Sequence, residues 1–160
     1  MDVQDEELLN FWRVLNKHEV RYIMVGGLAT RLHGYNRITD DLDVWLKDTL
    51  SNRQNFRKAF SELGYGDYES IETMQFVPGW TTFYAAGVEL DIMTEMLGLE
   101  NENFDTCFEM SNKAEIDGII IPFLHINHLI ANKKAVNRPK DQLDVIYLEK
   151  IRQLRQEEGL

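Results

Sequence analysis

Residues 22–45 constrain the fold of this chain more than any other part of the sequence. A short apolar run ends at Gly26-Gly27, a helix-like segment follows, and the chain then enters an extended stretch that contains Asp41 and Asp43. Side chains two residues apart on a strand lie on one face, with backbones roughly 7 Å apart. Two carboxylates held side by side repel each other, so such a pair usually binds a cation. A glycine turn beside it predicts a site for phosphates and magnesium.

Composition is that of an ordinary soluble protein. The 160 residues include 27 Asp+Glu and 17 Lys+Arg, which gives a formal net charge of −10. This charge argues against broad binding to nucleic-acid backbones, because such binding needs clustered basic residues. The single cysteine, Cys107, excludes an internal disulfide. With an acidic N-terminus and no long apolar run, the sequence predicts a cytoplasmic protein with no membrane segment.

Hydrophobic periodicity and turn residues predict helices mixed with strands. Helices are expected at about 6–18, 28–33, 52–63 (with Ser51 as N-cap), 104–110, 127–134 and from 139 onward. Strands are expected at about 22–25, 42–46, 73–77, 81–85, 88–93 and 115–122. The apolar face expected for the last helix consists of Leu143, Tyr147, Ile151 and Leu154. The pattern predicts one α/β domain over residues 1–160, with a mixed-sheet core at about 20–124 and a helical pair at about 125–160.

A third acid lies on a later predicted strand. In VELDIM (88–93) the apolar residues share one face, and Glu89 and Asp91 share the other. If this strand lies beside the strand of Asp41 and Asp43, three or four carboxylates converge. Such a cluster suits two magnesium ions, which can activate an attacking hydroxyl and stabilise a leaving pyrophosphate. No His/Cys spacing indicates zinc.

The order of these motifs resembles a known superfamily. A Gly-Gly pair, 13 residues, Asp-x-Asp and a later third acid are similar to the nucleotidyltransferases that share the polymerase-beta-like palm. The longer string GGLATRLHGYNRITDDLD (26–43) resembles a small bacterial branch related to abortive-infection and toxin–antitoxin nucleotidyltransferases. KKAVNRPKDQLD (133–144) is similar to the closing motif of that branch. The resemblance covers about residues 22–148 and implies a minimal nucleotidyltransferase fold.

The resemblance implies a role for each matching position. Asp41 and Asp43 match the metal-binding pair, and Asp91 matches the third acid, which completes the metal site or takes the acceptor's proton. Gly26 and Gly27 match the turn that contacts phosphate. Many members have Gly-Ser at this turn, so this chain would use backbone N–H groups instead of a hydroxyl.

Several polar residues have two interpretations each. Arg37 and Thr39 could contact phosphates, but Arg37 could instead pair with Asp40 or Asp41. The basic cluster of Lys133, Lys134, Arg138 and Lys140 could bind a triphosphate, or it could be a solvated turn between helices with Asp141 and Asp144 as partners. His33 is expected at the end of a helix, hydrogen-bonded to a carbonyl. The candidate nucleotide-binding residues are therefore Gly26, Gly27, Arg37, Thr39, Lys133 and Lys140.

The predicted function is transfer of a nucleoside monophosphate from a nucleoside triphosphate, ATP foremost, to a hydroxyl acceptor with release of pyrophosphate. Magnesium or manganese is the expected cofactor, bound by Asp41, Asp43 and Asp91. The acceptor stays open: a small molecule, a protein or an RNA end. The alternative is a catalytically silent module of a two-gene system, which binds a nucleotide or a protein partner in the manner of an antitoxin.

Overall fold

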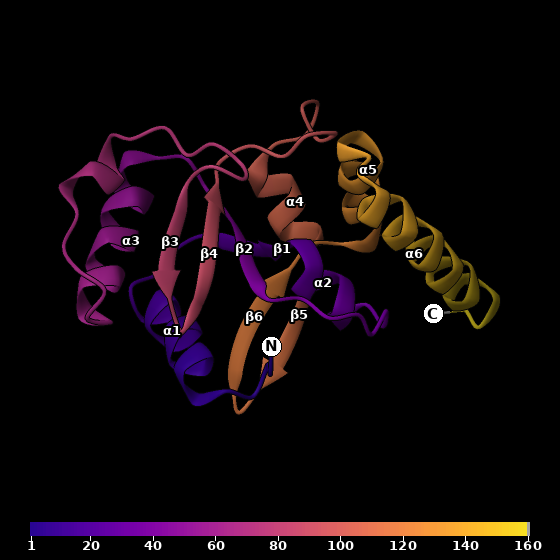
Figure 1. Cartoon of the computed structure of the whole chain (residues 1–160), viewed down its shortest axis with the longest axis horizontal. Coiled ribbons are helices and arrows are strands. Elements are labelled where there is room, and N and C mark those ends of the chain that lie inside the picture. The colour runs from indigo at the N-terminus through magenta and orange to yellow at the C-terminus, as the bar shows by residue number, and fades with distance from the viewer. Residues whose placement is uncertain (160) are drawn as a thin grey trace.

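The computed structural model describes residues 1–159 and contains one six-stranded sheet with helices around it (Figure 1). The strand order is β3-β4-β2-β1-β6-β5, in which β2 pairs with β4 and β1 with β6 in parallel; the other pairs are antiparallel. The strands are β1 (Tyr22–Val25), β2 (Asp41–Leu46), β3 (Thr82–Ala85), β4 (Val88–Met93), β5 (Asn112–Ile116) and β6 (Ile119–Phe123). The helices are α1 (Glu6–Lys17), α2 (Gly26–Leu32), α3 (Leu50–Glu62), α4 (Phe104–Met110), α5 (Ile126–Val136) and α6 (Pro139–Glu157), with a 3-10 turn η1 (Glu69–Glu72). The predicted α/β fold with a mixed sheet is confirmed.

The central strands are the most apolar part of the sheet. β1 is buried over its whole length, and α2 packs against both β1 and β2. Leu42 and Val44 of β2 are fully buried, which leaves Asp41 and Asp43 on the opposite face. The alternation along β2 is therefore what directs its two acids away from the core.

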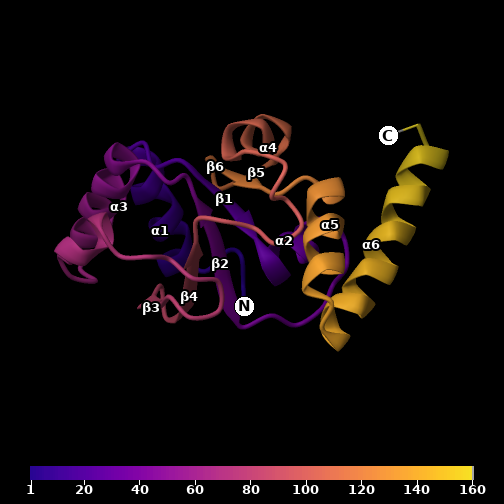
Figure 2. The ribbon, with the colours of Figure 1, turned by 90° about the horizontal axis from the view of Figure 1, so that it is seen from above.

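Helices enclose the sheet at both ends of the molecule. α1 starts at Asp5, whose carboxylate accepts hydrogen bonds from the N–H groups of Glu7 and Leu8, and it contacts α3 and β6. α5 and α6 pack against each other and form the predicted C-terminal helical pair. In both views this pair lies at the end of the molecule opposite α3 (Figures 1 and 2).

The strand expected at residues 73–77 is absent from the structure, and a turn after η1 takes its place. The guanidinium of Arg53 donates hydrogen bonds to the carbonyls of Ile71 and Met74. Its charge also lies 4.6 Å from the centre of the Phe76 ring. Arg53 thus satisfies the Met74 carbonyl of the expected strand, and the Val77 carbonyl accepts from the N–H groups of Trp80 and Thr81 in a local turn, so these residues do not join the sheet.

Residues 115–122, expected as one strand, form most of a hairpin. β5 and β6 pair in antiparallel fashion from Ile116 opposite Ile119 outward. Asp117 and Gly118 between them have φ angles of 50° and 76°. Asp-Gly with two positive φ angles makes the tight turn typical of two-residue hairpins. The sequence analysis did not identify this turn, because it contains only two residues and the isoleucines on both sides of it are typical of a strand.

The predicted helix starts need two small corrections. α2 begins at Gly26, within the glycine turn, and not at residue 28. The N-cap of α3 is Thr49, whose hydroxyl accepts from the N–H of Asn52, so Ser51 lies inside the helix. Pro139 opens α6 as predicted, at a position where its missing N–H has no helical partner.

Of the apolar face predicted for α6, only Ile151 packs against the core. Leu143, Tyr147 and Leu154 are exposed by 48%, 43% and 48%. The buried positions of this helix are instead Asp141, Asp144 and Leu148. The ion pairs described below hold this side of the helix against the molecule, together with the apolar contacts of Val145, Leu148 and Ile151.

His33 connects three elements at the end of α2. Its Nε2 lies 2.7 Å from the carbonyl oxygen of Leu124, and its Nδ1 lies 3.3 Å from Nη1 of Arg155 on α6. Burial lowers the pKa of His33 to about 4, so the ring is neutral, donates from Nε2 and accepts at Nδ1. This geometry is the carbonyl-bonded arrangement expected from the sequence.

We predict that His33→Phe keeps the packing but lowers the free energy of unfolding by about 1–3 kcal/mol, because the Leu124 carbonyl loses its buried donor. His33 should also contribute less to wild-type stability as pH decreases from 6.5 to about 4, since only the unfolded ring then takes up a proton. The variant should lack this part of the slope. Urea denaturation between pH 4 and 8 measures both effects, with His18→Gln, at a half-buried histidine that contacts Glu62, as control; equal slopes for the wild type and His33→Phe would contradict the assignment.

Candidate active site

Four carboxylates line one cleft because β2 and β4 are parallel neighbours in a defined register. Asp41 lies opposite Glu89, and Asp43 lies opposite Asp91. All four line a cleft with a volume of about 790 Å³. The acids that the sequence analysis selected on two separate strands are therefore brought together on one face of the sheet.

The electrostatics of the cleft disfavour a full set of negative charges. Burial, followed by the charges of Asp91 and Asp41, raises the pKa of Asp43 to about 7. The positive charges of Lys133 and Lys140 oppose this rise. Burial also raises the pKa of Asp91, although the N–H of Gly79 donates to its Oδ2 at 2.8 Å and acts in the other direction.

The donor set fits a hard divalent cation. Asp91 Oδ1 is buried and has no hydrogen-bond partner within residues 1–159. A divalent cation would bind this oxygen, and its positive charge would offset the negative charges of the three aspartates. Asp41, Asp43 and Asp91 are the residues that could hold it, with the exposed Glu89 beside them.

The glycine turn lies directly against the acidic strand. Gly26 has a φ angle of 70°, and a Cβ there would collide with the carboxylate of Asp43. A Cβ on Gly27 would lie 2.6 Å from Thr39 Oγ1 and 3.0 Å from Nη2 of Arg37. The two glycines are thus needed for different reasons: the first for backbone conformation and contact with Asp43, the second for contact with Thr39 and Arg37. This crowding also explains why Gly-Gly stands where Gly-Ser is common.

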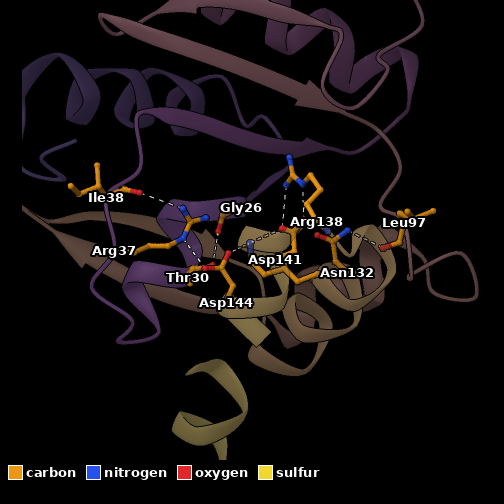
Figure 3. A network of polar contacts seen from close by, with 10 residues as sticks. Gly26, Thr30, Arg37, Ile38, Leu97, Asn132, Arg138, Asp141 and Asp144 are labelled. Carbon is orange, nitrogen blue, oxygen red and sulfur yellow. Dashed lines mark hydrogen bonds and ion pairs between the residues drawn. The ribbon is translucent and has the colours of Figure 1, made fainter. Parts of the chain in front are cut away.

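A buried ion-pair network attaches the C-terminal helices to the cleft (Figure 3). Arg37 Nε lies 2.9 Å from Oδ1 of Asp144, and Lys133 Nζ lies 2.7 Å from its Oδ2. Lys133 is also 3.6 Å from Asp141, which binds the guanidinium of Arg138 at 2.6 Å. Three cations and two buried carboxylates leave one positive charge in excess beside the acidic strands.

Every residue predicted for the site lines the same cleft, but the cations differ in their availability. Arg37 pairs with Asp144 rather than with Asp40 or Asp41, and Lys133 is 3% exposed between two carboxylates. Lys140 is exposed at the rim. The predicted residues that line the cleft are Gly26, Gly27, Arg37, Thr39, Asp41, Asp43, Asp91, Lys133 and Lys140.

Sequence reasoning named Asp141 and Asp144 as possible partners of the basic cluster but missed the pairing of Asp144 with Arg37, and it left Arg138, which also lines the cleft, out of the candidate site. The only available signal was the spacing of Asp141 and Asp144, which places both acids on one side of a helix. Glu95 and Asn132 complete the rim, and nothing in their surroundings in the sequence marks them.

A glycine turn beside the acids of two parallel strands is the arrangement that the sequence analysis expected for a nucleotidyltransferase. A family model supports the same conclusion over nearly the whole sequence. Residues 4–160 match the family described as "Nucleotidyl transferase of unknown function (DUF2204)", and the chain belongs to that family. The superfamily predicted from the motifs is therefore confirmed.

Solved structures with a similar fold are nucleotidyltransferases too. TM1012 from Thermotoga maritima, described as a nucleotidyltransferase, is 18% identical, with a TM-score of 0.55 over 95% of this chain and 90% of that one. The antibiotic-resistance factor ANT(2'')-Ia is 17% identical, with a TM-score of 0.58 over 99% and 93%. The structure of its complex with adenylyl-2''-tobramycin is 16% identical, with a TM-score of 0.58 over 98% of this chain and 97% of that one. These likenesses show the fold.

No curated protein matches the sequence. Among the described residues, no helix has the length and apolar character to cross a membrane.

We predict that Asp43→Asn stabilises the metal-free protein by about 1–3 kcal/mol at pH 8. The wild-type carboxyl keeps its proton up to about pH 7 when folded but loses it near 3.8 when unfolded, so the contribution of Asp43 to stability should fall as pH rises through this window, opposite in direction to that of His33. The variant should lack that fall. Thermal unfolding in a chelator from pH 4 to 8 measures it, and the exposed neighbour substitution Asp40→Asn should keep the wild-type profile. A destabilised Asp43→Asn protein would contradict the assignment.

We also predict that Gly27→Ser lowers the free energy of unfolding by about 1–3 kcal/mol through overpacking against Thr39. The loss should shrink in a Thr39→Ala background, where the colliding hydroxyl is absent. A double-mutant cycle of urea denaturation curves measures the coupling between the two positions. Strictly additive effects would show that Thr39 does not limit the side chain at position 27.

Proposed function

We propose that this protein transfers a nucleoside monophosphate from a nucleoside triphosphate to a hydroxyl acceptor and releases pyrophosphate. The observation that carries this proposal is the register of β2 and β4. It sets Asp41 and Asp43 beside Asp91, next to the Gly26 turn, in one open cleft. Membership of a nucleotidyl transferase family supports the reaction class.

Asp41, Asp43 and Asp91 would hold Mg²⁺ or Mn²⁺. Divalent metal ions in such a site lower the pKa of an attacking hydroxyl and offset the charge of the leaving pyrophosphate. Asp91 would either complete the metal site through Oδ1, which has no hydrogen-bond partner in the described part of the chain, or take the acceptor's proton, for which its raised pKa is suited.

The glycine turn and the nearby cations would bind the phosphates, ATP being the first candidate donor. Gly26 and Gly27 leave room for the phosphates to approach the backbone N–H groups. Arg37 and Lys133 act from fixed positions, since Asp144 holds both. Thr39 Oγ1, directly against Gly27, is placed to supply the hydroxyl that a serine at position 27 would supply in a Gly-Ser turn. Lys140 is exposed at the rim and can move toward the distal phosphates.

A cationic, hydroxylated small molecule is the acceptor that we propose. Asp40, Glu89 and Glu95 add negative charge to the rim of the cleft, and the chain has a net charge of −10. Such a surface attracts polycations. The ANT(2'')-Ia complex, which contains adenylyl-2''-tobramycin, is a protein of similar fold with an acceptor of this kind.

Label transfer from α-phosphate-labelled ATP, GTP, CTP and UTP tests the proposal directly. Each nucleotide is incubated with Mg²⁺ or Mn²⁺ and with an aminoglycoside panel, a cell lysate or the protein alone. We expect metal-dependent transfer to a hydroxylated polycation. Label on a protein or an RNA would keep the reaction and replace the acceptor. Saturable nucleotide binding with no transfer to any acceptor would favour the silent, partner-binding alternative.

Substitutions of the acids separate their roles. Asp41→Asn, Asp43→Asn and Asp91→Asn should each lower kcat more than about 100-fold while the fold is kept, because each removes a preorganised charge. Glu89→Gln is the matched control on the same strand as Asp91 and should change the rate far less. A rate that drops for Glu89→Gln and not for Asp91→Asn would assign the third acid to Glu89.

A further inference from the structure

A second cluster of metal-ligating side chains lies outside the carboxylate cleft. Cys107 comes from α4, His128 from α5, and Glu102 from the segment that leads into α4. One potential ligand atom of each residue lies within 4.8 Å of those of the other two. None of the three lines the cleft that holds the aspartates. The fold, and not a sequence motif, brings these residues together.

Burial and an unpaired nitrogen indicate that this cluster is more than a chance contact. The Cys107 side chain is fully buried, and His128 is only 8% exposed. His128 Nδ1 is buried and has no hydrogen-bond partner within residues 1–159. A buried polar nitrogen without a partner is destabilising, and native structures contain few of them. A bound ligand at this position would remove that penalty.

We propose that Glu102, Cys107 and His128 bind one Zn²⁺ ion. Thiolate, imidazole and carboxylate are the three ligand types of zinc sites in proteins, and tetrahedral coordination separates them by about 3.5 Å. Glu102 is exposed, so its side chain can rotate to close the remaining distance, and its solvent-facing side leaves room for water as the fourth ligand.

The chemistry of the cluster selects zinc over the ions of the cleft. When the zinc–sulfur bond forms, the Cys107 S–H bond breaks and its proton passes to solvent. Burial and the charge of Glu102 raise the pKa of Cys107 to about 11, so the metal-free thiol is neutral at physiological pH. Magnesium prefers oxygen ligands alone and does not compete for a sulfur and nitrogen site.

A zinc ion here would join α4 to α5 and so act structurally. α5 also carries Asn132 and Lys133 of the cleft. The segment before α4 already follows α5 closely: Asn132 donates to the Leu97 carbonyl at 2.8 Å, and Gly98 packs against the backbone of Ala131. The ion would fix this contact and thereby the position of α5 beside the sheet.

Cobalt substitution tests the site with a readout independent of activity. The full-length protein is stripped with a chelator and titrated with Co²⁺ alone. We expect one equivalent to produce a thiolate-to-cobalt charge-transfer band, and one equivalent of Zn²⁺ to abolish it. Cys107 is the only cysteine in the chain, so Co²⁺ bound to the aspartates of the cleft cannot produce this band. Zn²⁺ should also raise the melting temperature.

Matched variants make the test decisive. Cys107→Ser should remove the band, and His128→Gln and Glu102→Gln should each weaken Co²⁺ binding more than about 10-fold, since even partners of ligands contribute that much. The substitutions His18→Gln and Glu109→Gln should leave binding unchanged. If Cys107→Ser fails to fold, the other two ligand variants decide. No charge-transfer band in the wild type, or unchanged affinity in both His128→Gln and Glu102→Gln, would overturn the proposal.

Discussion

The parallel pairing of β2 with β4 is the constraint on which the candidate active site depends. It places Asp43 directly beside Asp91, where two negative charges repel each other. The pairing cannot shift by one residue, because Leu42 and Leu90, both fully buried, would then leave the core. The packing of the core therefore keeps the two carboxylates close together, and positive charges have to offset their repulsion. Lys133 supplies part of this positive charge from outside the sheet, and a bound metal ion would supply the rest.

The need for nearby cations explains the position of the C-terminal helices. Asp144 of α6 binds Lys133 of α5 and Arg37 of the segment before β2, so one carboxylate orients cations from two other parts of the chain. Buried ion pairs contribute little net stability, since desolvation offsets their attraction, but a missing partner is strongly destabilising. The network therefore selects one orientation of α6. In that orientation Leu143 and Tyr147 face solvent, although they have the spacing of a core face.

Local sequence patterns predicted the elements of this protein better than the contacts between them. The alternation around Asp43 and Asp91 predicted two strands with acids on one face, and the core residues between the acids made that prediction reliable. The strand expected at 73–77 does not form, because Arg53, about twenty residues earlier, binds the Met74 carbonyl and a local turn takes the Val77 carbonyl. The pairing of Arg37 with Asp144 and the approach of Cys107 to His128 depend on tertiary packing, which no local spacing encodes.

The candidate site also shows where function and stability conflict. Asp43 lies against the backbone of Gly26 and beside two other acids, and its raised pKa means that ionisation at neutral pH opposes folding of the metal-free chain. An asparagine would fit the same space without that penalty. A carboxylate is advantageous at this position only when a cation offsets its charge. The least stable arrangement of charge in the sheet is thus the one that the proposed reaction would use, and the fully buried Leu42, Val44 and Leu90 hold it in place.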